Sequence, residues 1–401
     1  MKKWLSILLA CMMFITSSIC ASADEQTQYA YTQYGYPIMF NSVDTGYSSL
    51  YHNNTHYVPL RGIFEKLGAA IFYRSTDRQI IALSRDGDII RHIVGSNTIS
   101  VNNIIKYFEH PSVLNNDSTY ISIDMLATAF CTDRISYDNQ QLNIQKYLFN
   151  NEYHKIIKDV LDVCRYSNFY PEKFQRYINY HEQSPDYNIQ EVLLRVNLDL
   201  DYPFYENITT IEHPYELLIL VNKQHKLPSG FHQYNLVQMD KKYTVNDGKE
   251  YLLAGVAYDK YVQMAEAANR EGLAMRVLSA YRTEDYQANL YNNKVASTGK
   301  INADNYSARP GHSEHQTGLA VDISSTNTTF EYSAEFMWLQ QHAHEYGFIL
   351  RYPKNKEWIT GYSYEPWHYR YVGTDVASII HQENITYEEF YVKYISQNEF
   401  R

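Results

Sequence analysis

The feature that most constrains this chain is the segment 308–323, which reads ARPGHSEHQTGLAVDI. His315 and Asp322 lie seven residues apart in it, on either side of a glycine turn. Asp322 falls within an apolar run, 319–323, that predicts a short buried strand. A carboxylate without a partner is costly to bury, and a bound cation removes that cost. The fold is therefore expected to bring further cation ligands to this segment.

A second set of chemically capable side chains stands near the C-terminus, in the run EPWH at 365–368. His368 opens a predicted strand, and Glu365 lies on the bend before it. Two histidines and an aspartate, with a glutamate nearby, are the components of a hydrolytic zinc site, which has three protein ligands, an open position for water and a base. Each residue alone has an ordinary structural explanation. Their joint spacing predicts one zinc ion per chain, held by His315, Asp322 and His368.

The N-terminus carries a targeting signal. Lys2 and Lys3 precede an apolar stretch, 4–15, and the small residues at 21–23 fit a cleavage site. We therefore predict a signal peptide over residues 1–23 and a protein that is secreted or associated with the cell wall. Lipidation at Cys11 is the alternative, but the residues after this cysteine are apolar, which favours plain secretion. No later run approaches the ~20 apolar residues of a membrane-spanning helix.

Charge and cysteine content exclude several classes of protein. The chain has 35 basic and 45 acidic residues and no basic block, so nucleic acid is not an expected partner. Of the four cysteines, only Cys131 and Cys164 remain after signal removal, and they could form one disulfide outside the cell. A zinc site held by thiolates is therefore excluded, and the ligands must be histidine and carboxylate.

Residues 24–150 consist of short alternating strands separated by Asn, Asp and Gly turns. One unit occurs twice, because 57–67 and 120–130 each predict a strand that leads into a short helix, and a hairpin follows each of them. This pattern resembles the copper amine oxidase N-terminal-like stalk domain of secreted bacterial proteins. The resemblance implies a positioning or wall-contact module. Copper is not expected, since ligand spacing is absent among His52, His56, His92 and His110.

The rest of the chain divides in two. Apolar residues at helical spacing predict a helical linker over 151–197, with a helix-start signal at Ser184-Pro185-Asp186. From 198 to 401 the pattern changes to mixed strands and helices, which predicts an α+β domain. In this domain we predict strands at 217–223 and 275–279, and helices at 256–271, 284–293 and 334–346.

Five ordered motifs make the C-terminal part similar to the VanY-type D-alanyl-D-alanine carboxypeptidases, bacterial zinc peptidases that trim peptidoglycan stems. The motifs are LLILVNKQHKLP (217–228), LSAYRTEDYQANLY (278–291), ARPGHSEHQTGLAVDI (308–323), WLQQHAHEYGFILRYP (338–353) and EPWHYRYVG (365–373). The resemblance implies helices on one side of a mainly antiparallel sheet, with zinc in a central cleft. It assigns zinc ligation to the same three residues that the chemistry selects. It also implies a secreted D,D-carboxypeptidase that hydrolyses the terminal D-alanine from stem peptides.

The other polar residues take supporting roles in this prediction. Glu365 removes a proton from the attacking water and passes it to the leaving amine. Arg282, at the end of a strand, stabilises the negative charge that builds on the carbonyl oxygen. We also predict that Ser313, Gln287 and Arg309 bind the terminal carboxylate of the substrate. Trp367 is predicted to form a wall of the pocket. Structural roles are predicted for His342 and His344, and at most an indirect contact with the site for His312.

Other functions fit parts of this pattern. The same ligands would serve an L,D-carboxypeptidase or an endopeptidase acting on the same stems. A serine hydrolase built on Ser313 fits poorly, because the segment 311–315 lacks the second glycine of a nucleophile elbow. A wall-binding protein with an inactive site is an alternative from a different class. It is disfavoured because the chain keeps all three zinc ligands, the base Glu365 and Arg282.

Overall fold

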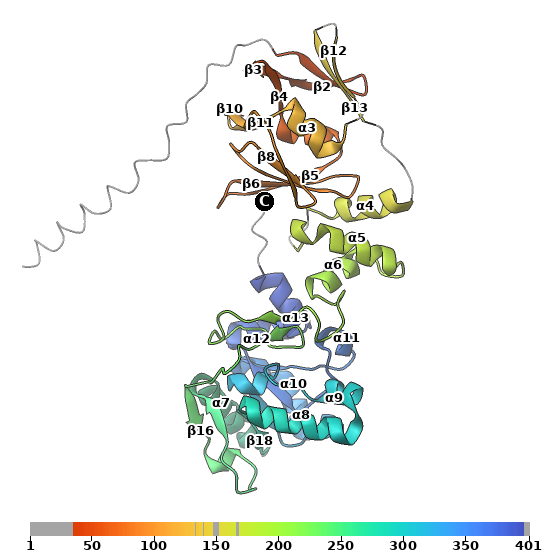
Figure 1. Cartoon of the computed structure of the whole chain (residues 1–401). Helices are drawn as coiled ribbons and strands as arrows, with labels where there is room; N and C mark the ends of the chain where they lie inside the picture. The colour runs from red at the N-terminus through yellow and green to blue at the C-terminus, as the bar shows by residue number, and fades with distance from the viewer. Residues whose placement is uncertain (1–34, 133, 139, 147–151, 166–167, 397–401) are drawn as a thin grey trace, which may run out of the picture. The chain divides into compact units, whose positions relative to one another are not determined.

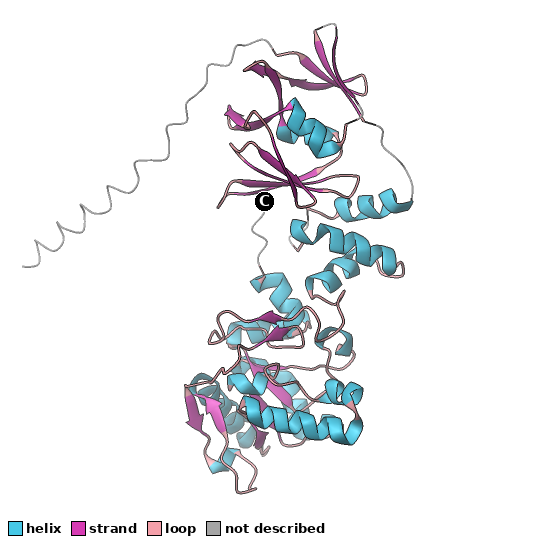
Figure 2. Ribbon diagram, viewed as in Figure 1, coloured by secondary structure: helices cyan, strands magenta, loops and turns pink. Residues whose placement is uncertain are grey.

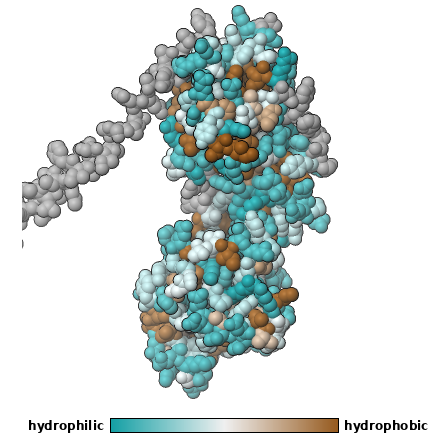
Figure 3. All heavy atoms as spheres, viewed as in Figure 1, coloured by the Kyte–Doolittle hydropathy of each residue, from teal (hydrophilic) through white to brown (hydrophobic). Residues whose placement is uncertain are grey.

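The computed structural model describes residues 35–132, 134–138, 140–146, 152–165 and 168–396. The chain divides into two compact units between Cys164 and Arg165, and each is described by itself (Figure 1). The predicted signal peptide, 1–23, and Cys11 lie outside the described residues. None of the described helices combines the length and the apolar character needed to cross a membrane. The face drawn in Figure 3 is mostly hydrophilic, with small hydrophobic areas.

The N-terminal unit is rich in strands (Figure 2). Its sheets have the orders β12-β13-β1-β2, β10-β11-β4-β3 and β5-β6-β7-β8-β9. The strands of the first two sheets are β1 (Pro37–Phe40), β2 (Val43–Ser48), β3 (Leu50–His52), β4 (Thr55–Pro59), β10 (Val113–Asn115), β11 (Ser118–Ser122), β12 (Arg134–Asp138) and β13 (Gln141–Gln145). The third sheet and the two short helices are β5 (Ala70–Arg74), β6 (Gln79–Leu83), β7 (Ile89–Ile93), β8 (Thr98–Val101), β9 (Ile104–Tyr107), α2 (Leu60–Lys66) and α3 (Ile123–Phe130).

The predicted repeat is present in this unit. β4, α2 and the hairpin β5–β6 form one copy, and β11, α3 and the hairpin β12–β13 form the other. β4 and β11 pair antiparallel, with Tyr57 opposite Ser122, so the two copies meet in the middle of one sheet. Phe64 of α2 and Phe130 of α3 pack edge to face, with ring centroids 4.5 Å apart. The two helices therefore share one hydrophobic core.

The cysteines and the buried histidines of this unit have ordinary surroundings. Cys131 is exposed and forms no disulfide, whereas Cys164 is buried. His56 Nδ1 lies 3.0 Å from the Ser49 hydroxyl, and burial lowers the pKa of its ring. Burial likewise lowers the pKa of His92, whose two nitrogens contact the Thr98 carbonyl and the Ser112 hydroxyl.

The region predicted as a helical linker is divided by the boundary between the units. α4 (Glu152–Asp162) lies before the boundary, and α5 (Phe174–Gln183) and α6 (Ile189–Asn197) lie after it. α6 is the helix expected after Pro185. It begins where Asn188 and Glu191 form a capping box, in which each side chain bonds the backbone N–H of the other residue.

The C-terminal unit mixes helices with an antiparallel sheet in the order β18-β19-β21-β20. The strands of this sheet are β18 (Val277–Ser279), β19 (Ala320–Ile323), β20 (Phe348–Leu350) and β21 (His368–Tyr371). Two small pairs join β14 (Thr209–Thr210) to β15 (His225–Lys226) and β16 (Leu236–Gln238) to β17 (Leu252–Ala254). The helices are α7 (Gly255–Arg270), α8 (Glu284–Thr298), α9 (Lys300–Tyr306), α10 (Ala334–His342), α11 (Glu357–Thr360), α12 (Thr374–Glu383) and α13 (Tyr387–Phe390). The α+β class is confirmed.

One predicted strand is wrong. Residues 217–223 are largely buried but form no strand. A side chain, not a neighbouring strand, bonds part of their backbone, because Arg370 donates to the carbonyls of Leu217 and Ile219 at 2.9 and 3.3 Å. The apolar run correctly predicted burial. Burial also suits an irregular segment when side chains satisfy its backbone groups.

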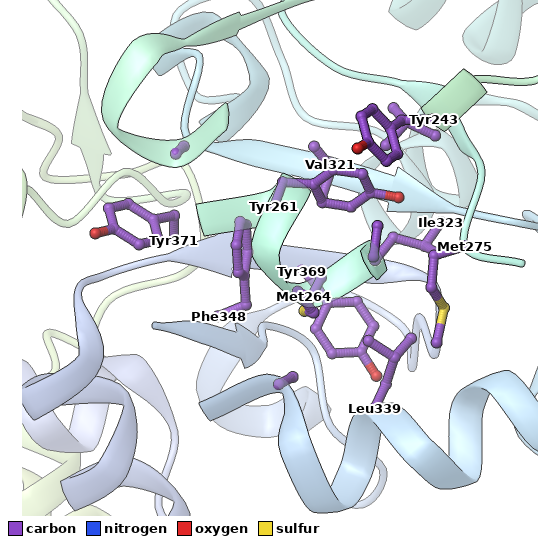
Figure 4. Packing of buried hydrophobic residues seen from close by; sticks show 14 of the residues in the cluster. Tyr243, Tyr261, Met264, Met275, Val321, Ile323, Leu339, Phe348, Tyr369 and Tyr371 are labelled. Carbon is purple, nitrogen blue, oxygen red and sulfur yellow. The ribbon is translucent and has the colours of Figure 1, made fainter. Parts of the chain in front are cut away.

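The central sheet separates a hydrophobic core from the face that carries the predicted site. Side chains alternate between the two faces along each strand. The core side is formed by residues of the sheet and of helices α7 and α10, among them Tyr261, Met264, Val321, Ile323, Leu339, Phe348, Tyr369 and Tyr371 (Figure 4). Alternation therefore leaves Asp322 of β19 and His368 of β21 on the opposite face.

Candidate metal centre and active-site cleft

His315 is positioned by a short 3-10 helix and the glycine that ends it. The helix, Glu314–Thr317, is followed by Gly318, whose φ of +66° lies in the left-handed region. A Cβ at this glycine would also lie 2.9 Å from the Leu236 side chain, so the position requires glycine. The turn leads into β19 and brings His315 Nε2 to 3.4 Å from Asp322 Oδ2.

Asp322 and His368 are neighbours across two strands. In the antiparallel pairing of β19 with β21, Asp322 stands directly opposite His368. Paired residues project from the same face of a sheet, with their Cβ atoms close together. His368 Nδ1 consequently lies 3.2 Å from Asp322 Oδ1. Strand register thus joins the two segments that the sequence singled out separately.

Each histidine ring is oriented through its outer nitrogen. Nδ1 of His315 donates to the Ala280 carbonyl at 2.7 Å. Nε2 of His368 lies 3.4 Å from Glu314 Oε2. This leaves Nε2 of His315 and Nδ1 of His368 directed at the Asp322 carboxylate. Metal-binding histidines are typically held in this way, by the nitrogen that does not contact the metal.

The donor atoms fit a zinc ion. One atom each of His315, Asp322 and His368 lies within 4.8 Å of the other two, and all three residues are buried. Ligands ~2.0–2.1 Å from zinc in a tetrahedral site stand ~3.3 Å apart. The distance from His315 Nε2 to Asp322 Oδ2, 3.4 Å, and the distance from His368 Nδ1 to Asp322 Oδ1, 3.2 Å, are each close to that value. Asp322 Oδ1 is buried, and its neighbour at 3.2 Å, Nδ1 of His368, is itself a ligand atom, so a cation between the two atoms would satisfy both.

Arg282 lies beside this group and is held from three sides. Its Nη2 donates to Asp322 Oδ2 at 2.8 Å and to Ser279 Oγ at 2.7 Å, and its Nη1 donates to Gln287 Oε1 at 3.3 Å. It does not cap α8, because the Thr283 hydroxyl accepts the N–H of Tyr286 there. The guanidinium therefore has a fixed place at the wall of the site.

Glu314, which the sequence analysis missed, holds His368 from behind. Its buried Oε1 accepts hydrogen bonds from Arg351 Nε at 2.8 Å and Arg370 Nη1 at 3.1 Å. Arg351 also pairs with Glu388 of α13 at 2.7 and 2.9 Å. Burial alone would raise the pKa of Glu314, but the two arginines outweigh it and hold that pKa well below its usual range. The overlooked signal was the arginines themselves, since an arginine inside an apolar run requires a carboxylate partner.

Glu365 faces the metal ligands without belonging to them. Its Oε2 lies 3.7 Å from His368 Nδ1, and its backbone N–H donates to the Tyr352 carbonyl at 3.1 Å. Burial raises the pKa of the Glu365 carboxyl to about 7. A carboxyl group with a pKa near neutrality can both take up and release a proton at physiological pH.

These residues line a cleft with a volume of about 590 Å³. Ser313, Gln287 and Trp367 also line it, as the sequence analysis expected. Gln287 is buried, and its amide donates to the Ala308 carbonyl at 2.8 Å. Their roles toward a substrate stay predictions. Lining residues that the sequence did not single out include Lys294, Tyr306, Asn327, Thr328, Tyr352 and Tyr362.

Arg309 lies outside the set of cleft-lining residues. Its guanidinium makes two hydrogen bonds to the Asp304 carboxylate, at 3.0 and 2.8 Å, and stacks over the Tyr205 ring at 3.8 Å. Both interactions occupy the groups that a substrate carboxylate would use. Recognition of that carboxylate by Arg309 stays a prediction, and it would require this pair to open.

The other histidines near the site make structural contacts. His312 Nδ1 lies 2.8 Å from the Asn222 carbonyl, and burial lowers the pKa of its ring to about 4. His342 pairs with Glu345 at 3.3 Å, and His344 stacks on His381 with ring centroids 3.8 Å apart. None of these three histidines is among the residues that line the cleft, in keeping with the structural roles predicted for His342 and His344 and the indirect contact at most predicted for His312.

Zinc affinity should depend on pH through His368. Burial disfavours its charged ring, but hydrogen bonds with Asp322 and Glu314 outweigh burial and raise its pKa to about 9. Burial lowers the pKa of His315 to about 4, so that ring is already neutral. Below pH 9, zinc must displace the His368 proton, and its affinity should rise about tenfold per pH unit. Competition with a chelator between pH 6.5 and 8.5 measures this slope, and a pH-independent affinity would contradict it.

Comparison with known proteins identifies the two parts of the chain. Residues 250–374 match the family VanY, D-alanyl-D-alanine carboxypeptidase, and residues 41–145 match the copper amine oxidase N-terminal domain. YodJ of Bacillus subtilis is 42% identical over 196 residues, which are 47% of this chain and 71% of that protein.

A D-alanyl-D-alanine carboxypeptidase of Enterococcus faecalis is 36% identical over 183 residues, 43% of this chain and 65% of that enzyme, just under two thirds of its length. The solved structure of the LdcB LD-carboxypeptidase is 40% identical, with a TM-score of 0.44, and the match covers 46% of this chain and 90% of that one. The N-terminal unit carries a copper amine oxidase N-terminal domain, and the chain belongs to the VanY family of D-alanyl-D-alanine carboxypeptidases.

Proposed function

We propose that this chain is a secreted zinc D,D-carboxypeptidase that removes the terminal D-alanine from peptidoglycan stem peptides. It holds one zinc ion, and its N-terminal unit contacts the cell wall. The observation that carries the proposal is the buried group of His315, Asp322 and His368 in one cleft with Glu365, whose pKa is about 7. Family membership supports the substrate class.

The side chains around the group have complementary tasks in this reaction. Zinc, when bound, supplies a Lewis acid that polarises the peptide carbonyl and makes water more acidic. Glu365 takes a proton from the attacking water and gives it to the leaving amine of D-alanine. Arg282, held by Ser279 and Gln287, places its positive charge where the carbonyl oxygen becomes negative. Glu314 holds the ring of His368 in place throughout.

D-Alanine release from defined stem peptides tests the proposal. Residues 24–401, analysed for zinc, are incubated with a pentapeptide that ends in D-alanyl-D-alanine, and products are followed by mass spectrometry. We expect one D-alanine per pentapeptide and loss of activity after treatment with a chelator, with recovery on adding zinc. Absence of release from a chain that holds one zinc ion would overturn the carboxypeptidase assignment.

The tetrapeptide decides between the two stem bonds. A D,D-enzyme should leave a tetrapeptide with a single C-terminal D-alanine intact. Release from the tetrapeptide alone would assign the chain to the L,D bond between the third residue and D-alanine. Cleavage inside the stem would assign it to endopeptidases. In each case the same ligands and the same base carry the chemistry.

A further inference from the structure

A second groove, with a volume of about 680 Å³, lies in the N-terminal unit. Strands of all three sheets and helix α2 contribute to it, through β2, β5, β6, β10 and β11. The volume falls in the range of ~300–1,000 Å³ that is usual for sites that bind small molecules or short polymer segments. Because the walls come from different sheets, the groove is formed by the folded unit itself.

Two tyrosines and several aliphatic residues give the groove its character. Tyr47 of β2 and Tyr73 of β5 line it together with Ile71, Ile80 and Leu114. The Tyr47 ring is 39% exposed and contacts α2 at Gly62, where a Cβ would lie 2.4 Å from the ring. A tyrosine ring combines a flat apolar face with a polar edge, and a sugar ring has complementary apolar faces and hydroxyl edges.

The charges at the groove are balanced. Arg61 pairs with Glu65 at 3.5 Å. Arg78 and Asp117 line the groove at two turns, each with a φ of +59°, and neither side chain makes an ion pair or hydrogen bond among the residues described. Two arginines and two carboxylates thus line the groove. A phosphate-rich polymer would meet as many carboxylates as guanidinium groups, so the lining favours an uncharged ligand with many hydrogen-bonding groups.

We propose that this groove binds the N-acetylated glycan strands of the cell wall. Sugar rings stack on Tyr47 and Tyr73, the Arg78 guanidinium donates to acetamide and hydroxyl oxygens, and Asp117 accepts from hydroxyl groups. The muramic acid carboxyl is amidated by the stem peptide, so the glycan backbone is uncharged, as the lining requires. The inference extends the proposed function: binding to the polymer that carries the stem peptides raises their effective concentration at the cleft.

Sedimentation with peptide-free glycan tests the groove separately from the cleft. Wall sacculi are stripped of stem peptides and secondary polymers, and the muramic acid carboxyls that this frees are converted to amides, so that the glycan is uncharged as it is in the wall. The fraction of residues 24–401 that pellets is measured against glycan concentration. The test variant is Arg78→Asn with Asp117→Asn, since asparagine tolerates the left-handed backbone at both turns and the fold should survive. Arg134→Asn, at an exposed arginine of β12 outside the groove, is the matched control.

We expect the double variant to bind glycan about tenfold more weakly, equivalent to losing one or two hydrogen bonds. It should release D-alanine from soluble stem peptides at the wild-type rate and unfold at the wild-type temperature. Equal binding by the double variant, or stronger binding to purified teichoic acid than to glycan, overturns the proposal. Glycan binding without any D-alanine release would sustain this inference while refuting the proposed catalytic function.

Discussion

Replacement of Glu365 by glutamine should lower kcat for D-alanine release by about 10³-fold, within the ~10²–10⁴-fold range for a positioned general base. Glutamine keeps the size of the side chain beside His368 but cannot accept a proton from water. The carboxyl group is suited to this task because burial raises its pKa to about 7. Stopped-time assays with the pentapeptide at saturating concentration measure the change.

The pH profile and two further measurements separate a lost base from a damaged site. A base acts only when deprotonated, so wild-type activity should fall as pH drops below about 7, and the residual rate of Glu365→Gln should lack this dependence. Zinc content should not change, because Glu365 is outside the ligand group. Glu357→Gln, at an exposed glutamate of α11, should keep the wild-type kcat. A Glu365→Gln variant with more than a tenth of the wild-type kcat would contradict the assignment.

Glu314→Gln should both destabilise the C-terminal unit and weaken zinc binding. Arg351 and Arg370 are fully buried and both donate to Glu314 Oε1. Removing one partner from a buried ion network costs about 3–5 kcal/mol, because the remaining charges stay in the interior. The His368 ring also loses the carboxylate at its outer nitrogen. Changes at such an orienting residue lower metal affinity about 10–100-fold. Denaturant unfolding and chelator competition measure the two effects.

Glu388→Gln is the matched control for this variant. Glu388 pairs with Arg351 in the same buried network but has no contact with His368 among the bonds described. It should destabilise the unit by a similar amount and leave zinc affinity of the folded chain unchanged. Equal losses of zinc affinity in the two variants would show that Glu314 acts through general stability and not by orienting His368.

Local patterns predicted much of the fold. Periodicity predicted the strand–helix–hairpin repeat, the helix at 256–271 and the short strand around Asp322. The predicted bounds agree with the observed ones to within a few residues. The segment 217–223 could not be predicted in this way. Its apolar run shows that it is buried, but whether a buried run pairs with a strand depends on distant groups, here the Arg370 side chain that bonds two of its carbonyls.

The sequence by itself determined which residues form the centre of the site. Histidine and carboxylate are the only zinc ligands left once thiolates are excluded, and an aspartate inside an apolar strand needs a cation. Only the tertiary structure decided which nitrogen of each ring faces the metal position, and that Glu314 orients His368 from behind. The physical reason is that these contacts depend on strand register and on two arginines, one just after β20 and one on β21. Spacing along the segment 308–323 carries information about neither.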